Sequence, residues 1–180
     1  MLDPSEIEEL FPVASGDITL RLFNLGDIND RYVNWLNDPE VVKYSNQRFK
    51  KHTVGTCVDY YHSFADSEGI FLAIIASTGL MLGTVTIYCD SQHETADIGL
   101  MIGDTMQWGK GYGARAWGVV LNLLSHDACV RKVTGGTLDC NYGMIKIFER
   151  SGMIKEAVRT AQEIVDNQSV DVLYYAKFNE

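Results

Sequence analysis

The residues of this chain with the clearest chemical potential are three alternating glycines in the segment 107–116. They are Gly109, Gly111 and Gly113. An apolar run over residues 96–102, typical of a strand, precedes them, and apolar residues at helical spacing follow them. The first N–H groups of a helix have no partner within the helix, and glycine lets a phosphate approach the backbone closely. We therefore expect a phosphate-bearing ligand here, the alternative being a glycine turn that only packs a helix against a sheet.

The composition limits the class of protein to which such a site can belong. The chain has 180 residues, 46% hydrophobic and 22% charged, which is typical of one globular domain. We expect a single domain over residues 1–180, with residues 1–16 as a flexible N-terminal extension. No apolar stretch approaches the ~20 residues that span a bilayer, and no basic leader segment is visible. The sequence thus favours a cytoplasmic protein without a membrane partner.

The net charge of −9 argues against nucleic acid as a partner, because phosphate backbones are bound chiefly through Lys and Arg. It is compatible with a cationic substrate such as an amine. The cysteines form no C-x-x-C pair, so we expect reduced thiols; they are Cys57, Cys89, Cys129 and Cys140. The four histidines show no metal-ligand spacing, and we expect no metal site.

Hydrophobic patterning predicts a mixed α/β fold. Strands are expected at residues 18–23, 70–76, 81–88, 95–102, 132–138, 154–160 and 170–178. Helices are expected after a cap at Asp27, after a cap at Thr53, over residues 111–127, and from Asn141 to Gly152. The strand–loop–helix–strand unit over residues 95–138 should be a right-handed crossover that joins two parallel strands.

This order of elements excludes two nucleotide-binding folds. Gly111, Gly113 and Ala116 fit the dinucleotide pattern G-x-G-x-x-G/A, but three antiparallel strands before it break the alternating topology of a Rossmann unit. Asp139 also lies farther along than the acidic residue of that motif. No G-K-[ST] follows the glycines, which excludes a P-loop.

The glycine segment instead resembles the pyrophosphate loop of the GNAT superfamily of N-acetyltransferases, Arg/Gln-x-x-Gly-x-Gly/Ala, with Trp108 in the Arg/Gln position. Asp97-Ile98-Gly99-Leu100 is similar to the Glu-Ile-Gly of the family's fourth strand, and Asn141 with residues 148–153 resembles its Asn…Tyr-Glu-Lys-x-Gly-Phe. Residues 35–41 are similar to the first-helix segment of a branch that contains ribosomal-protein N-terminal acetyltransferases and nucleotide-amino-sugar N-acetyltransferases.

The resemblance implies a central, mostly antiparallel sheet with a splayed parallel pair of strands and about four helices. It implies acetyl-CoA as co-substrate, with the pantetheine arm along the backbone of Leu100, Met101 and Ile102. The residues implied to hold the pyrophosphate are Trp108, Gly109, Lys110, Gly111, Tyr112, Gly113 and Ala114. Asn141 would bind the acyl-pantetheine arm, or cap a helix, or both. Phe148 would lie beside the cofactor.

The resemblance also implies direct attack of a neutral amine on the thioester, with a base to take the amine proton and a backbone N–H for the oxyanion. Asp97 fills the position of the family's basic glutamate, Glu94 is the second candidate, and Asn141 completes the catalytic set. The family's acid, a tyrosine, is replaced by Phe148, and a serine that some relatives use is replaced by Met144. Tyr142, Ser151 or water are the remaining acids.

Three functions stay open at this stage. The first is acetylation of a small amine, including an amino sugar carried on a nucleotide, for which Arg48, Lys50 and Lys51 could bind phosphate. The second is acetylation of a protein N-terminus, and the third is a catalytically weak acyl-CoA-binding module. The basic cluster could equally be a solvated loop, and a homodimer is left open.

Overall fold

The protein is described by a computed structural model over residues 4–126 and 130–179. Its strands are β1 (Val13–Ser15), β2 (Ile18–Leu22), β3 (Gly69–Ala76), β4 (Met81–Asp90), β5 (Thr95–Ile102), β6 (Lys132–Leu138), β7 (Ile154–Val165) and β8 (Gln168–Phe178). Its α-helices are α1 (Pro4–Glu8), α2 (Asp30–Asn37), α3 (Pro39–Val42), α4 (Val54–His62), α5 (Tyr112–His126) and α6 (Tyr142–Arg150). Short 3-10 helices are η1 (Leu25–Asp27), η2 (Asn46–Phe49) and η3 (Thr105–Gln107).

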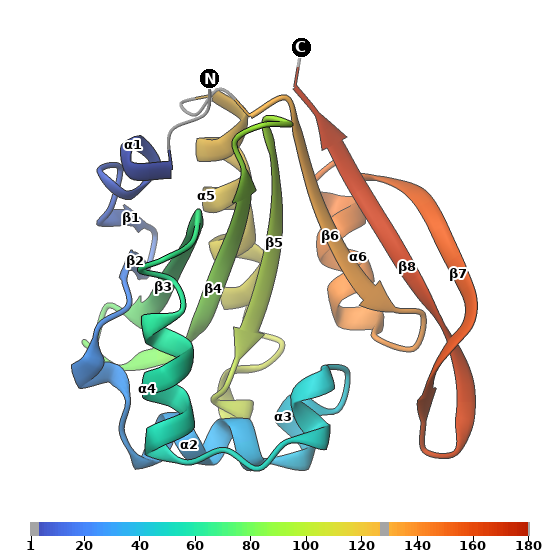
Figure 1. Cartoon of the computed structure of the whole chain (residues 1–180), viewed down its shortest axis with the longest axis horizontal. Coiled ribbons are helices and arrows are strands. Elements are labelled where there is room, and N and C mark those ends of the chain that lie inside the picture. The colour runs from blue at the N-terminus through green and yellow to red at the C-terminus, as the bar shows by residue number, and fades with distance from the viewer. Residues whose placement is uncertain (1–3, 127–129, 180) are drawn as a thin grey trace.

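All eight strands form one sheet in the order β1-β2-β3-β4-β5-β6-β8-β7. Every neighbouring pair is antiparallel except β5 and β6, which are parallel, as the sequence predicts. The parallel ladder covers only three residue pairs, from Thr95 opposite Lys132 to Asp97 opposite Thr134. Beyond them the two strands diverge, which gives the sheet its V-shaped opening (Figure 1). This confirms the predicted splayed pair.

Helices cover the two faces of the sheet (Figure 1). On one face, Trp117 and Leu124 of α5 pack with Val85 and Ile87 of β4 in the main core. On the other face, α2 and α4 enclose a second core with β3; it contains Phe23, Tyr32, Trp35, Cys57 and Phe71. Successive residues of a strand point to opposite faces, so the apolar residues of the central strands supply both cores.

The structure has six α-helices in its described residues where the sequence predicted about four. The two unpredicted ones, α1 and α3, have five and four residues, too few to show a helical repeat. Residues 1–16 were expected to be an extension; instead β1 pairs with β2 and the Ile7 side chain is buried in the main core. A single apolar anchor of this kind gives no periodic signal.

The predicted cap at Asp27 is wrong. Asn29 caps α2, and its side chain accepts a hydrogen bond from the backbone N–H of Tyr32. The Asp27 carboxylate is instead buried and paired with the Arg21 guanidinium over 2.6 Å. The cap at Thr53 is confirmed, because its hydroxyl accepts from the N–H of Thr56.

The remaining strands and helices follow the prediction closely, apart from β7, which continues to Val165 instead of ending near residue 160. Cys57, Cys89 and Cys140 are free thiols, whereas Cys129 lies outside the described residues. Within residues 4–126 and 130–179, no helix is long and apolar enough to cross a membrane.

Candidate active site

The opening between β5 and β6 leaves two strand edges without a neighbour. β4 pairs with β5 as far as Ile102, and β8 pairs with β6 as far as Leu138. The inner edges, residues 98–102 of β5 and 135–138 of β6, therefore carry backbone groups that the sheet does not use. An extended ligand with amide groups can bind there as an added strand would. The resemblance implied a pantetheine arm along Leu100, Met101 and Ile102, and its binding at this edge stays a prediction.

The glycine loop lies between the end of β5 and the start of α5. The first helical hydrogen bond runs from the N–H of Arg115 to the carbonyl of Gly111 over 2.9 Å. The amides of residues 111–114 are consequently the free donors of the first turn, at the positive end of the helix dipole. Gly109 and Gly111 have φ of +76° and +85°, which other residues rarely adopt, and no atom crowds the side where a Cβ would stand. The loop is open to an anion.

Close packing fixes this loop to the opening. A Cβ on Gly113 would lie 3.3 Å from the Leu100 side chain, so this glycine brings the start of α5 onto β5. The indole Nε1 of Trp108 donates to the carbonyl of Ile102 over 2.8 Å, which ties the loop to the strand end. That carbonyl thus already accepts one hydrogen bond. The Met101 carbonyl points toward Gly83 of β4, so by alternation along the strand Leu100 is the remaining candidate whose backbone faces the opening. The ammonium of Lys110 donates to the Gln107 side chain over 3.0 Å.

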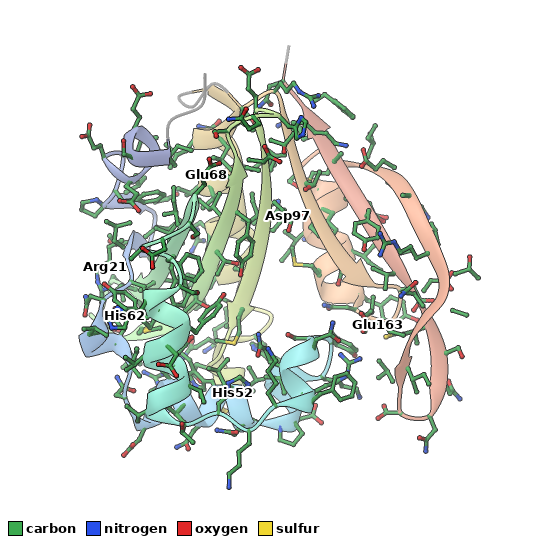
Figure 2. The ribbon with its side chains drawn as sticks, in the orientation of Figure 1. Arg21, His52, His62, Glu68, Asp97 and Glu163 are labelled. Atoms are coloured by element: carbon green, nitrogen blue, oxygen red, sulfur yellow. The ribbon has the colours of Figure 1, made fainter. Side chains whose placement is uncertain are left out.

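Asp97 lies at the apex of the opening, on the side of β5 that faces β6 (Figure 2). Its Oδ2 accepts a hydrogen bond from the Thr134 hydroxyl over 2.6 Å. The side chain is exposed, yet surrounding protein atoms partly desolvate the carboxylate and raise its pKa above the ordinary value, while the Thr134 hydrogen bond opposes that rise. An accessible carboxylate with a raised pKa has the properties of a general base.

Glu94 is not brought to the same place. It precedes β5, and its backbone carbonyl accepts from the N–H of Arg131 over 2.9 Å. The paired residues Thr95 and Lys132 separate it from the opening, which begins only after Asp97. The structure thus favours Asp97 over Glu94 as the base.

Asn141 caps α6, with its side-chain oxygen 3.3 Å from the N–H of Met144. It follows β6 directly, so it lies at the end of the strand that borders the opening. The capping role is therefore visible, and a contact of its amide with an acyl-pantetheine arm stays a prediction.

Phe148 is a core residue with no exposed surface. Its ring packs against Trp117 and Tyr175, with centroids 5.1 and 4.8 Å away, and its edge lies against Gly135. The sequence had placed Phe148 at the cofactor; the ring offers no surface for such a contact because α6 turns this position toward the sheet. Of the candidate acids, Ser151 already donates its hydroxyl proton to the Phe148 carbonyl over 2.8 Å. Tyr142 is exposed.

A pocket of about 810 Å³ lies between the α2–η2 segment and the β7–β8 turn. Two ion pairs cross it: Arg48 to Glu163 over 3.0 Å and Lys43 to Asp166 over 3.4 Å. Lining residues include Asn37, Lys43, Arg48, Phe49, Lys50 and Asn167. The Nη1 atom of Arg48 is buried and has no hydrogen-bond partner among the described residues. An anionic group on a ligand could satisfy it.

Of the basic cluster in the sequence, the structure places Arg48 and Lys50 at this pocket but not Lys51, which is exposed elsewhere. Sequence reasoning did not identify Thr134, Glu163 or Asp166. Each is an ordinary strand or turn residue whose partner is far along the chain, so no local signal could have found it. No group of three potential metal ligands occurs in residues 4–126 and 130–179.

Comparison with known families matches residues 17–154 to the acetyltransferase (GNAT) domain. Comparison with curated protein sequences finds no match. Among solved structures, the chain resembles spermidine N-acetyltransferase from Vibrio cholerae in complex with CoA and spermine, with a TM-score of 0.81, 16% identity, and 92% and 97% of the two chains covered.

Two further structures share the fold. The ribosomal L7/L12 acetyltransferase RimL in complex with CoA gives a TM-score of 0.80 at 12% identity, covering 93% of this chain and 97% of that one. The microcin C7 self-immunity acetyltransferase MccE in complex with acetyl-CoA and AMP gives 0.76 at 20% identity, covering 91% and 93%. The family match spans most of the sequence, and the glycine loop and splayed strands lie where the motifs predicted. The chain belongs to the GNAT acetyltransferase family.

Proposed function

We propose that this acetyltransferase moves the acetyl group of acetyl-CoA to the primary amine of a small molecule that also carries an anionic group. A nucleotide-linked amino sugar is the compound class that fits best. The observation that carries the acetyl transfer is the junction of the glycine loop, the open edges of β5 and β6, and Asp97 at the apex between them. A phosphate site, an amide-binding edge and a base then lie along one path.

In the proposed reaction, the amine nitrogen attacks the thioester carbonyl carbon, a C–N bond forms, and the C–S bond breaks to release the CoA thiolate. Asp97 takes the proton that the nitrogen loses, directly or through one water. A backbone N–H on the free edge of β5 stabilises the oxyanion. Because Phe148 has no acidic proton and is buried, the thiolate takes its proton from water or from the exposed Tyr142. A thiolate is a tolerable leaving group, so the reaction does not depend on a strong acid.

The pocket crossed by the two ion pairs supports a small acceptor. Arg48–Glu163 and Lys43–Asp166 connect the helical segment to the β7–β8 hairpin, so the acceptor side is bridged, not an open groove. A folded protein presenting its N-terminus needs an open groove. Lys43, Arg48 and Lys50, together with the exposed ring of Phe49, provide cations for phosphate and an aromatic face for stacking. The AMP bound by the MccE relative is consistent with this choice.

The test is release of the CoA thiol with a panel of amines under one set of conditions. The panel contains amino sugars with and without a linked nucleotide, spermidine, and N-terminal peptides of ribosomal proteins. We expect the highest kcat/KM with the nucleotide-linked amino sugars. A preference for the peptides or for spermidine would reject the proposed acceptor while leaving the acetyl transfer in place.

A further inference from the structure

We propose that Thr134 is a positioning residue that orients the Asp97 carboxylate; this inference rests on the proposed function of Asp97 as the base. The Thr134 hydroxyl oxygen lies 2.6 Å from Asp97 Oδ2 and 3.4 Å from the carbonyl oxygen of Ala96. A hydroxyl has one proton to donate, and the shorter contact to a charged acceptor takes it. The proton therefore points at the carboxylate.

The hydrogen bond between Thr134 and Asp97 can orient the carboxylate because of its position in the sheet. Asp97 and Thr134 are the last paired residues of the β5–β6 ladder, so the bond spans the two strands just where they separate. Beyond it, the strand edges face the opening. An aspartate in such a place can rotate toward solvent, and the bond removes that freedom. Thr134 suits the task because a β-branched residue on a strand has a stiff χ1.

The hydrogen bond also sets the basicity of Asp97. Burial by neighbouring atoms raises the pKa of the carboxyl, and the Thr134 hydroxyl lowers it by stabilising the charged form. A cation in the same place would lower the pKa further and make the carboxylate a poorer base. A neutral donor orients the group while leaving it able to accept a proton.

The other groups around Asp97 do not take over this role. Tyr88 on β4 is the cross-strand partner of Asp97, and its hydroxyl is 2.8 Å from that of Tyr60 on α4. Lys132, two residues before Thr134 on β6, is paired with Glu156 over 2.8 Å. The two tyrosine hydroxyls bond to each other and the lysine has its own carboxylate, so Thr134 is the donor bonded to Asp97 in this set.

The test compares Thr134→Val, which keeps the shape and removes the hydroxyl, with Thr134→Ser, which keeps the hydroxyl. The pKa of Asp97 is measured by carbon NMR titration of its carboxyl, assigned with Asp97→Asn, and the pH profile of kcat/KM is measured in parallel. In Thr134→Val, the pKa and the acidic limb of the profile should both rise by about one pH unit, because a stabilising bond to the ionised form is lost. Thr134→Ser should stay within a few tenths of a unit of wild type.

The acetyl-CoA thermal shift should be equal in all three proteins, which separates positioning from cofactor binding. If the Asp97 titration and the profile in Thr134→Val coincide with wild type, the inference is overturned. If Asp97→Asn retains full turnover, the base assignment fails and Thr134 has no catalytic group to position. If Thr134→Val is poorly folded, Thr134→Ala gives the same comparison, and an unshifted Asp97 pKa in that variant also contradicts the inference.

Discussion

Arg48 and Glu163 are 115 residues apart in the sequence, yet Nη2 of the arginine donates to Oε2 of the glutamate over 3.0 Å. Both side chains are largely buried, with exposed fractions of 14% and 23%. The guanidinium also lies 4.4 Å from the centre of the Phe49 ring. Nη2 of Arg48 thus holds the β7–β8 hairpin, whereas the buried Nη1 has no hydrogen-bond partner among the described residues.

Replacing Arg48 by alanine should raise the KM for the acceptor by about 10-fold or more, since a charge-assisted hydrogen bond is lost. The affinity for acetyl-CoA should not change, because the pocket is separate from the glycine loop. Steady-state kinetics with a nucleotide-linked amino sugar measure both. The control is Lys155→Ala, which removes an exposed cation from β7 away from the pocket. An unchanged acceptor KM in Arg48→Ala would reject the anion site.

Replacing Gly111 by aspartate should abolish the rise in melting temperature that acetyl-CoA produces. A carboxylate would stand where the pyrophosphate is expected, and repulsion would exclude it. The matched control is Gly79→Asp in the β3–β4 turn, where φ is +82° against +85° at Gly111 and the space is equally open. Both variants should lose about 1–2 kcal/mol of stability from the left-handed backbone, but only Gly111→Asp should lose the response. If acetyl-CoA raised the melting temperature of both variants equally, the pyrophosphate would have to bind elsewhere.

Replacing Asp97 by asparagine should lower kcat by roughly 10–10⁴-fold with little effect on acetyl-CoA binding, the range for loss of a general base. In wild type, activity should fall as the pH falls through the raised pKa of Asp97, because only the ionised carboxylate accepts a proton. Asp97→Glu should retain most of the turnover, as glutamate is also a carboxylate base. Near-normal kcat in Asp97→Asn would assign proton removal to water.

Replacing Phe148 by tyrosine should not increase turnover, although it restores the residue that the family commonly carries. The Phe148 ring is completely buried against Trp117, Gly135 and Tyr175, so an added hydroxyl meets packed apolar atoms. We expect a loss of about 1–3 kcal/mol in the free energy of unfolding, measured by urea denaturation. A higher kcat in this variant would show that the hydroxyl reaches the thiolate after all.

The sequence predicted those parts of the fold that depend on local patterns. The helix at Tyr112–His126 begins directly after Gly111 and carries an apolar helical repeat, and the strand at Lys132–Leu138 has the predicted bounds; the structure confirms both. The short α3 has no such repeat, and the Asp27 cap was misplaced because a capping residue and an ion-pairing carboxylate look alike in sequence. The contact with Arg21, on a neighbouring strand, makes Asp27 an ion-pairing residue and not a helix cap.

In the candidate site, too, residues in local motifs could be predicted and residues that depend on tertiary contacts could not. The glycine loop and Asp97 could be proposed from the sequence because they belong to contiguous motifs with a physical reason for each residue, and their roles stay predictions. Thr134 and Glu163 could not be proposed, since each acts through a partner on a distant strand or helix. The burial of Phe148 was also unpredictable, because it depends on how α6 packs against Trp117 and not on the motif around it.

The most direct test of the account is the initial rate of CoA thiol release from acetyl-CoA with a nucleotide-linked amino sugar, measured beside the acetyl-CoA thermal shift. We predict release that depends on the acceptor, saturates with it, and falls at least 10-fold in Asp97→Asn, with the thermal shift intact in both proteins. A clear thermal shift without CoA release from any amine in the panel would contradict catalysis and indicate a module that only binds acyl-CoA.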